Sequence, residues 1–380
     1  MLTLNRKIIE ENLLNSPFKV PSDSYRSSIY QFFVRNFIIN RLIFNYRWFH
    51  LTFSSLTLSL LVIRTITFIL EITKNLNSSE FAISIFLVFT ISECWCLYVV
   101  LESIGFPSTS FVRNFDSIWG QLRCSYDENV YKQLVRSTFS ANIQTGIVEV
   151  TNLASVAANS YIEYFDEKRD NIMIFIGGKL IDIFISLLTF NLLRGFFIAH
   201  NFIKIGHQHV NNQMKMIIES PHVPDSTLYR LRYEHFQLVR CGELCDLAYR
   251  RFVTMSCLVV VPSSIVILYN LAYVDLTISS QVVYFVILLQ NFNFFVFFSI
   301  HLIGFYSHPG RVRDDIYQST LIERSDSYKS EALLFMELID KNSSGIKFMG
   351  IYLLTPDIVP NLAAFVFTYV MAIPNFLTTK

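Results

Sequence analysis

The chain has 380 residues, of which 52% are hydrophobic and only 16% are charged, and its formal net charge is +1. Soluble proteins carry about 25% charged residues, so this composition excludes an ordinary soluble domain. The mean hydropathy of +0.40 indicates a membrane protein, and the balanced charge gives no sign of nucleic-acid binding.

Apolar stretches of spanning length recur along the chain. A bilayer core needs about 20 apolar residues in a helix, and six stretches meet this length. A seventh is weaker because it contains many small and hydroxyl residues and Glu149, but the loop charges favour including it. The predicted fold is an all-α membrane protein with seven transmembrane helices, at 49–72, 81–103, 137–161, 173–200, 252–274, 281–305 and 357–377.

Positive charges are distributed unevenly over the segments between these spans. With the N-terminus inside, the inner segments hold 24 of the 31 Lys and Arg residues, and the outer segments hold four. Because cytoplasmic loops carry the excess of Lys and Arg, we predict the N-terminus inside and the C-terminus outside. This orientation leaves the sequon at Asn77 outside, as a glycosylation candidate.

The same orientation divides the chain into four parts. They are a cytoplasmic N-terminal segment at 1–47, a six-helix transmembrane sensor region at 48–305 with a cytoplasmic helical loop near 201–252, a cytoplasmic anchor at 306–348, and a last helix at 349–380 as the candidate pore helix.

The inner segments are predicted to form helices below the membrane. Residues 224–251 place apolar side chains at steps of three and four from Leu228 to Ala248, after a predicted N-cap at Asp225-Ser226-Thr227. Residues 328–340 show a similar pattern. These faces fit an assembly surface and ordinary surface amphipathicity equally well, so both interpretations stay open.

Six cysteines fall within spans or inner segments, where thiols stay reduced, so no disulfide framework is expected. Cys241 and Cys245 lie one helical turn apart, and His207, His209 and His235 are near enough in sequence to suggest zinc. Two thiols at this spacing are more often packing residues. We therefore expect no metal and no cofactor.

The last helix carries the most informative pattern. Thr355-Pro356-Asp357 is a typical helix start, and Pro360 one turn later predicts a kink or restart, that is, a split last helix. Small and polar residues then recur within an arc of about 80°. Such a stripe fits close helix packing or the lining of a water-filled pore. Its members are Asn361, Ala364, Thr368, Ala372 and Asn375.

Polar and aromatic residues also occur inside the other spans. Charges at these depths are costly, so they are expected either to neutralise each other or to line a ligand pocket. The intramembrane charges are Arg64, Glu93, Glu149, Lys179 and Asp182, with Lys179 and Asp182 close enough to pair. Aromatic candidates for ligand binding are Trp95, Tyr161, Tyr269 and Tyr284, and Gln290, Asn291 and Asn293 mark a polar face in the sixth span.

The end of the chain resembles the signature that closes insect gustatory receptors. Thr368-Tyr369, five mostly apolar residues and Asn375-Phe376 are similar to the Thr-Tyr, five hydrophobic residues and Gln-Phe of that family. The preceding cytoplasmic helix, polar turn and short apolar stretch also resemble it. The one departure is Asn375 in place of the family's glutamine, which keeps the carboxamide on a shorter side chain.

This resemblance implies a function. The insect gustatory and odorant receptors are ligand-gated cation channels, assembled as tetramers through cytoplasmic helices, with the last helix lining the pore. It thus implies a gustatory-type chemosensory receptor in the plasma membrane of sensory neurons, which binds a small-molecule tastant or odorant and passes cations. Asn375 would replace the pore glutamine, and Ala372 would lie near the gate. Nematode gustatory-receptor-like proteins, class r serpentine receptors and light-sensing relatives are divergent alternatives.

Other functional classes fit the sequence less well. A G-protein-coupled receptor is disfavoured by the inward N-terminus and by the lack of an Asp-Arg-Tyr after the third span. A non-conducting member of the same fold stays open. No hydrolase, metalloprotease or nucleotide-binding motif is present, so we expect no enzyme activity.

Overall fold

The computed structural model describes most of the chain and consists almost entirely of helices. The described residues are 27–29, 32, 47–75, 80–105, 109–165, 172–220, 224–322, 324–341 and 345–377. Most of the N-terminal segment and the glycosylation candidate Asn77 lie outside them. The helices are α4 (Arg47–Asn75), α5 (Glu80–Gly105), α6 (Thr109–Trp119), η2 (Arg123–Tyr126), α7 (Glu128–Phe165), α8 (Ile172–Glu219), α9 (Asp225–Tyr273), α10 (Ile278–Ser307), η3 (Pro309–Arg311), α11 (Val312–Thr320), α12 (Asp326–Lys341) and α13 (Ile358–Leu377).

Each of the seven predicted spans lies largely within one helix: α4, α5, α7, α8, α9, α10 or α13. Three described helices are long and apolar enough to cross a membrane, and two shorter apolar helices accompany them. The chain is therefore a multi-pass membrane protein, while the count of seven spans and the orientation of the termini stay predictions. The three long segments are Ile176–Glu219, Ser226–Tyr273 and Ile278–Thr320, and the shorter ones are Ser54–Ile66 and Ile358–Ala372.

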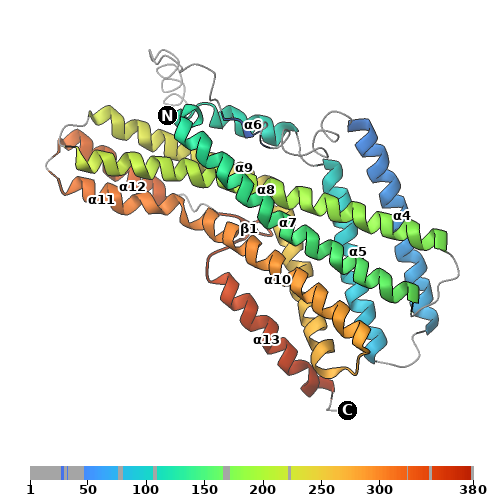
Figure 1. Cartoon of the computed structure of the whole chain (residues 1–380). Helices are drawn as coiled ribbons and strands as arrows, with labels where there is room; N and C mark the ends of the chain where they lie inside the picture. Colours follow the sequence, from blue (N-terminus) through green and yellow to red (C-terminus); the bar gives the residue numbers. More distant parts are fainter. Residues whose placement is uncertain are drawn as a thin grey trace.

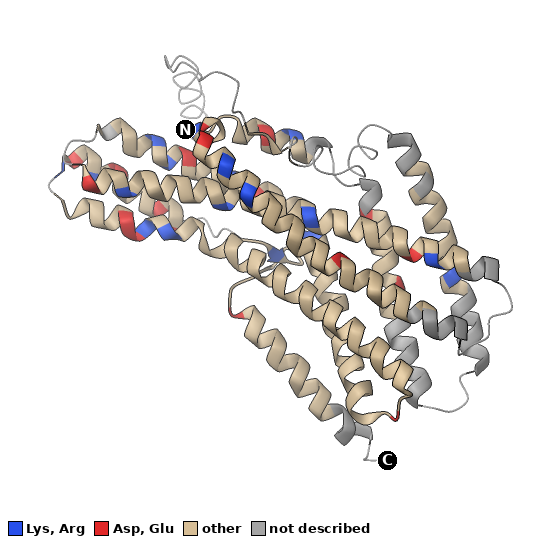
Figure 2. Cartoon of the chain, in the orientation of Figure 1, with Lys and Arg blue, Asp and Glu red and all other residues tan. Residues whose placement is uncertain are grey.

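Two helices extend far beyond a bilayer. α8 has 48 residues and α9 has 49, so each is about 70 Å long, more than twice the thickness of a hydrocarbon core. Their extensions meet α11 and α12 at one end of the molecule (Figure 1), and most of the charged residues gather at that end (Figure 2). The elongated bundle thus has a charged end and an apolar end.

The predicted apolar face of 224–251 is confirmed as a buried face of α9. Leu228, Leu231, Leu238, Cys241 and Cys245 are almost completely buried. The predicted N-cap is wrong by one position. Pro224 occupies the cap and makes no side-chain cap bond.

Aromatic packing joins α8, α9 and α10 where the charged end meets the apolar end. The ring of Phe196 lies 5.4 Å from Tyr249, 5.4 Å from Phe298 and 5.5 Å from Phe305, measured between ring centroids. All four side chains are buried. Such rings bury a large apolar area, so this cluster holds the three long helices in a fixed relative position.

The chain enters the last helix through a short hairpin. Strands β1 (Lys347–Phe348) and β2 (Tyr352–Leu353) pair antiparallel, with Lys347 opposite Leu353. Met349 and Gly350 turn the chain with positive φ angles of 52° and 77°. Tyr352 and Leu353, in the middle of the apolar stretch before the last helix, therefore form a strand.

The prediction of a split last helix is wrong, because α13 is one continuous helix of 20 residues. Pro360 is its third residue. The N–H groups of the first turn have no partner within the helix, so a proline at this position removes no helical hydrogen bond. A helix of 20 residues is about 30 Å long and matches the hydrocarbon thickness of a bilayer.

Candidate functional site

Contacts from α9 set the position of the hairpin that leads into α13. Thr254 accepts a hydrogen bond from the N–H of Met349 at 3.0 Å, and Asp246 accepts one from the N–H of Lys347 at 2.8 Å. Arg250 pairs with Asp246 and lies against Gly350, where an added Cβ atom would come within 2.8 Å of its guanidinium. The positive φ angle therefore favours glycine at 350, and a larger residue there would also require the Arg250 side chain to shift.

α13 packs against α9 with one face only. Ile358, Val359, Leu362 and Val366 are partly buried, and Val370 is the one fully buried side chain among the described positions of this helix. Near the far end, the hydroxyl of Tyr273 donates to Met371 Sδ at 3.7 Å. Figure 1 shows α13 at the side of the bundle, away from α4 and α5.

The predicted stripe lies on the other side of α13. At 100° per residue, its centre is about 150° from the face that contacts α9. Asn361, Ala364 and Thr368 are exposed and Ala372 is half-buried. The Thr368 hydroxyl donates to the carbonyl of Ala364 at 2.8 Å. Among the described residues, Asn361, Ala364 and Thr368 are therefore not used for packing within the chain.

Other motif residues have separate environments. Tyr369 is exposed on α13 and its ring lies 4.3 Å from that of Phe365. The helix continues through Asn375 and Phe376, whose side chains lie outside the described part of the structure.

Four of the five predicted intramembrane charges come together between α4, α5 and α8. Arg64 forms ion pairs with Glu93 and with Asp182, the latter at 2.6 Å. Lys179 lies 3.7 Å from Asp182. The hydroxyl of Thr65 also donates to Glu93 at 3.2 Å. Within the described residues, these charges neutralise one another, as the pairing interpretation predicts.

Glu149, the fifth charge, belongs to a second polar group that links α7, α8 and α10. Ser186 donates to Glu149 at 2.8 Å, and the Asn152 amide donates to Ser186 at 2.8 Å. Gln290 donates to Asn152 at 2.8 Å. Since Asp182 and Ser186 lie one turn apart on α8, the two groups form a continuous polar layer across five helices.

Residues of the sixth predicted span add one further link. Asn291 donates to Ser263 at 2.9 Å and to Ser264 at 3.2 Å, which joins α10 to α9. Sequence reasoning missed Asn152 and Ser186. Their positions three and four residues after Glu149 and Asp182 on the same helices are the signal that could have found them.

The predicted ligand-binding aromatics are not brought together in the described structure. The ring of Trp95 lies 5.9 Å from Tyr98 and 5.9 Å from Phe252. Tyr269 packs against Tyr273, at 5.5 Å. No ring contact joins Trp95 to Tyr269 or Tyr284 among the described residues, and the side chain of Tyr161 lies outside them. A shared aromatic pocket stays a proposal.

Four of the five suggested zinc ligands are buried packing residues in this structure, and the fifth, His209, lies 3.9 Å from Asp127. Cys241 and Cys245 are fully buried in the core, and burial raises the pKa of both thiols. Burial holds the pKa of His207 well below its ordinary value and lowers that of His235 to about 4. Among the described residues, no group of three or more His, Cys, Asp and Glu side chains is arranged to hold a metal ion.

Buried histidines form a separate cluster that the sequence did not indicate. The Nδ1 atoms of His200 and His301 lie 2.7 Å apart, and His301 Nε2 lies 2.9 Å from Gln144 Oε1. His301 also stacks on Phe197, with ring centroids 3.8 Å apart. This cluster ties α7, α8 and α10 together below the polar layer.

Comparison with solved structures shows what this arrangement resembles. The insect olfactory receptor OR5 from Machilis hrabei matches with a TM-score of 0.64 and 13% sequence identity, over 98% of each chain. A structure of OR5 in complex with eugenol matches with a TM-score of 0.58 and 13% identity, again over 98% of each chain. No protein-family profile and no curated protein matches the sequence. The chain has the fold of the insect olfactory receptors, as its resemblance to the insect odorant and gustatory receptors predicts.

Proposed function

We propose that the chain is a chemosensory receptor that acts as a ligand-gated, non-selective cation channel, with α13 of four copies around a central pore. The observation that carries this proposal is the stripe of exposed Asn361, Ala364 and Thr368 and half-buried Ala372, opposite the face of α13 that packs on α9. The insect olfactory receptor fold supports the sensory part of the proposal.

The physical argument concerns what surrounds the stripe in a membrane. An amide exposed to hydrocarbon without a hydrogen-bonding partner is costly. Asn361 accordingly requires water, a polar headgroup or another protein surface beside it. The flanking exposed residues Phe365, Phe367 and Met371 suit lipid or protein contact. In a ring of four subunits, the stripe of each α13 would face water in the central pore, and the apolar residues beside it would contact neighbouring subunits.

The ligand is proposed to be a small organic tastant or odorant. The similar receptor OR5 is described in complex with eugenol, which supports a ligand of that size and chemistry. Tyr269 and Tyr284 on α9 and α10 are partly buried, and these positions remain the proposed contacts, with Trp95 and Tyr161. The protein would act in the plasma membrane of sensory neurons.

Electrical recording tests the proposal. The full chain, tagged at each terminus, is expressed in cells while currents are recorded during application of sugars, bitter compounds, phenolic odorants and light. We expect a cation current whose selectivity changes in Asn375→Gln and whose block by thiol reagents appears in Ala372→Cys. An external N-terminus, or a stimulus-evoked current unaltered by both substitutions, would contradict the pore assignment.

A further inference from the structure

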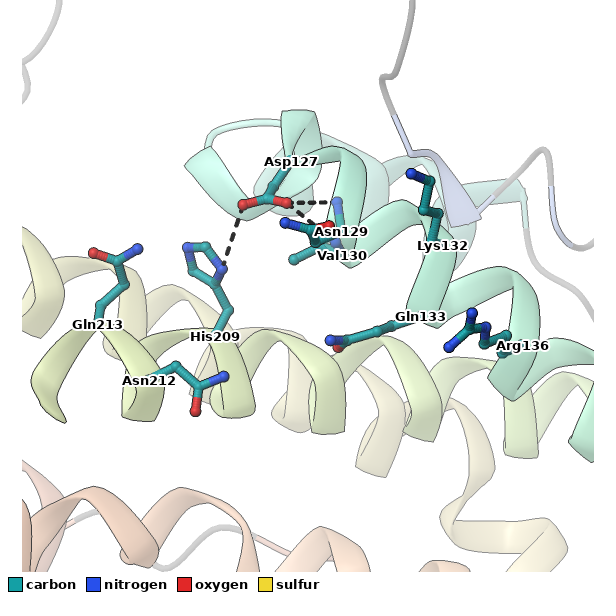
Figure 3. Close-up of a pocket in the computed structure, with 9 residues that line it drawn as sticks. All are labelled: Asp127, Asn129, Val130, Lys132, Gln133, Arg136, His209, Asn212 and Gln213. Atoms are coloured by element: carbon teal, nitrogen blue, oxygen red, sulfur yellow. Dashed lines mark hydrogen bonds and ion pairs between the residues drawn. The ribbon is translucent and has the colours of Figure 1, made fainter. Parts of the chain in front are cut away.

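An open polar cleft lies between the first turns of α7 and the cytoplasmic extension of α8. Its volume is about 410 Å³, which lies within the range of small-ligand pockets. In Figure 3, the ring of His209 on α8 points toward Asp127 at the start of α7, and Arg136 and Gln213 lie at opposite ends. The cleft is lined by cationic and amide side chains to which the proposed channel assigns no role.

Two cationic side chains, Lys132 and Arg136, line this cleft. Arg136 is exposed and has no ion pair with any described residue. Lys132 lies 2.7 Å from Glu128, but both side chains are more than half exposed, so their pair contributes little stability. Gln133, Asn212 and their neighbouring amides add uncharged hydrogen-bond donors. This combination suits a ligand with several phosphate oxygens.

The acid at the end of the cleft is already engaged. Asp127 Oδ1 accepts hydrogen bonds from the N–H groups of Asn129 at 2.7 Å and Val130 at 3.2 Å, which caps α7. Its Oδ2 atom lies 3.9 Å from Nδ1 of His209. Because the charge of Asp127 is held by the start of the helix, it opposes an incoming anion less than a free carboxylate would.

The cleft begins where the exposed surface of α7 changes from polar to apolar. Lys132, Gln133 and Arg136 are exposed, with Val135 as the one exposed large apolar side chain among them, whereas the exposed large side chains that follow are Phe139 and Ile143, at 67% and 50%. A change of this kind along a surface helix marks the boundary of the hydrocarbon. Arg136 therefore lies at headgroup level.

The distances of the cleft residues from the hydrocarbon boundary along α7 indicate how far the headgroup of a bound lipid must extend. At 1.5 Å per residue, Arg136 is about 4.5 Å and Lys132 about 10.5 Å from the level of Phe139, and Asp127 is about 18 Å from it. The phosphate of a simple phosphodiester lipid reaches the level of Arg136. Lys132 lies farther from the bilayer, so a ligand that contacts it must carry phosphates beyond the phosphodiester. We propose that this cleft binds the polyphosphorylated headgroup of an inositol phospholipid in the inner leaflet.

The test measures lipid binding to the purified full chain in detergent, through the fluorescence anisotropy of a labelled phosphatidylinositol bisphosphate. Arg136→Gln and Lys132→Gln are each expected to weaken binding about fivefold, because one basic residue near a membrane contributes about that factor. The matched control is Lys215→Gln, which removes an exposed charge from α8 outside the cleft and should leave affinity unchanged.

Each arm has a defined outcome. All three substituted side chains are exposed, so the three variants should have the same thermal midpoint as the wild type. Wild-type affinity in both cleft variants, or an equal loss in Lys215→Gln, overturns the site. Displacement of the label by phosphatidylserine as readily as by the inositol lipid overturns the headgroup assignment. Equal affinity for free inositol trisphosphate overturns the membrane source. The proposal does not depend on whether the protein conducts ions.

Discussion

Thr254 Oγ1 accepts a hydrogen bond of 3.0 Å from the backbone N–H of Met349, and this bond ties the hairpin before α13 to α9. Asp246, about two turns earlier on α9, holds the N–H of Lys347 in the same way. α13 itself packs on α9 further along. A movement of α9 at Asp246 and Thr254 should therefore also move the hairpin and the first turn of α13, the candidate pore helix.

Removing the Thr254 hydroxyl should loosen the hairpin. In Thr254→Val, the Met349 N–H loses its partner, which costs about 1 kcal/mol and should speed local amide exchange about fivefold. Hydrogen–deuterium exchange of residues 346–354 measures the effect. Thr254→Ser keeps a hydroxyl and should exchange like the wild type. Equal exchange in all three proteins would show that this bond does not hold the hairpin.

The ion pairs of Arg64 should be essential for folding in the membrane. Arg64→Gln leaves the carboxylates of Glu93 and Asp182 without their shared cation, and breaking a buried pair in this way costs about 3 to 5 kcal/mol. We expect low surface expression and a reduced thermal midpoint in detergent.

The double variant Arg64→Gln with Glu93→Gln separates charge balance from packing. It removes the partly buried cation Arg64 together with the buried anion Glu93, and Lys179 remains beside Asp182. Recovery of a substantial part of the lost thermal midpoint is expected. A double variant as unstable as Arg64→Gln alone would show that packing, and not neutralisation, sets the role of Arg64.

Buried histidines predict loss of stability in acid. Burial lowers the pKa of His235 to about 4, although its hydrogen bond to the carbonyl of Pro309 acts in the opposite direction. Burial also lowers the pKa of His308 to about 4. The unfolded chain takes up these protons near pH 6.5, before the folded chain does. Stability should therefore fall as the pH drops from about 6.5 to 4.

The pH dependence can be assigned to one side chain with a substitution. His235→Gln keeps a side-chain N–H for Pro309 and removes the titrating ring. Between neutral pH and pH 5, the variant should lose less unfolding free energy than the wild type, by about 1 to 3 kcal/mol. Its thermal midpoint should accordingly fall less over this pH range. Identical slopes for the two proteins would contradict the contribution of His235.

Much of the helical fold could be predicted from the sequence, because apolar runs and helical periodicity are local properties. The predicted spans at 173–200 and 252–274 lie in α8 and α9, yet the sequence did not show that these spans continue without a break into the helices predicted to be cytoplasmic. At the membrane boundary the surroundings change, but the helical period does not. The hairpin escaped notice because two residues per strand are too few to show alternation.

The candidate site shows the same division between local and long-range information. The spacing of Asn361, Ala364 and Thr368 predicted a common face, but only the packing of α13 on α9 shows that this face points away from the bundle. The intramembrane charges were identifiable singly. That Arg64 pairs with Glu93 and Asp182 depends on how three helices meet, which one sequence does not specify.

Thiol accessibility of two adjacent positions on α13 tests the pore proposal most directly. Thr368 and Phe367 are both exposed and lie at the same depth, but only Thr368 belongs to the stripe. Cysteine is placed at one or the other, with the exposed Cys94 and half-buried Cys257 replaced by alanine. A charged, membrane-impermeant thiol reagent is applied to both sides of isolated membranes. The account predicts modification at 368 and none at 367; modification of neither, or of both equally, would contradict it.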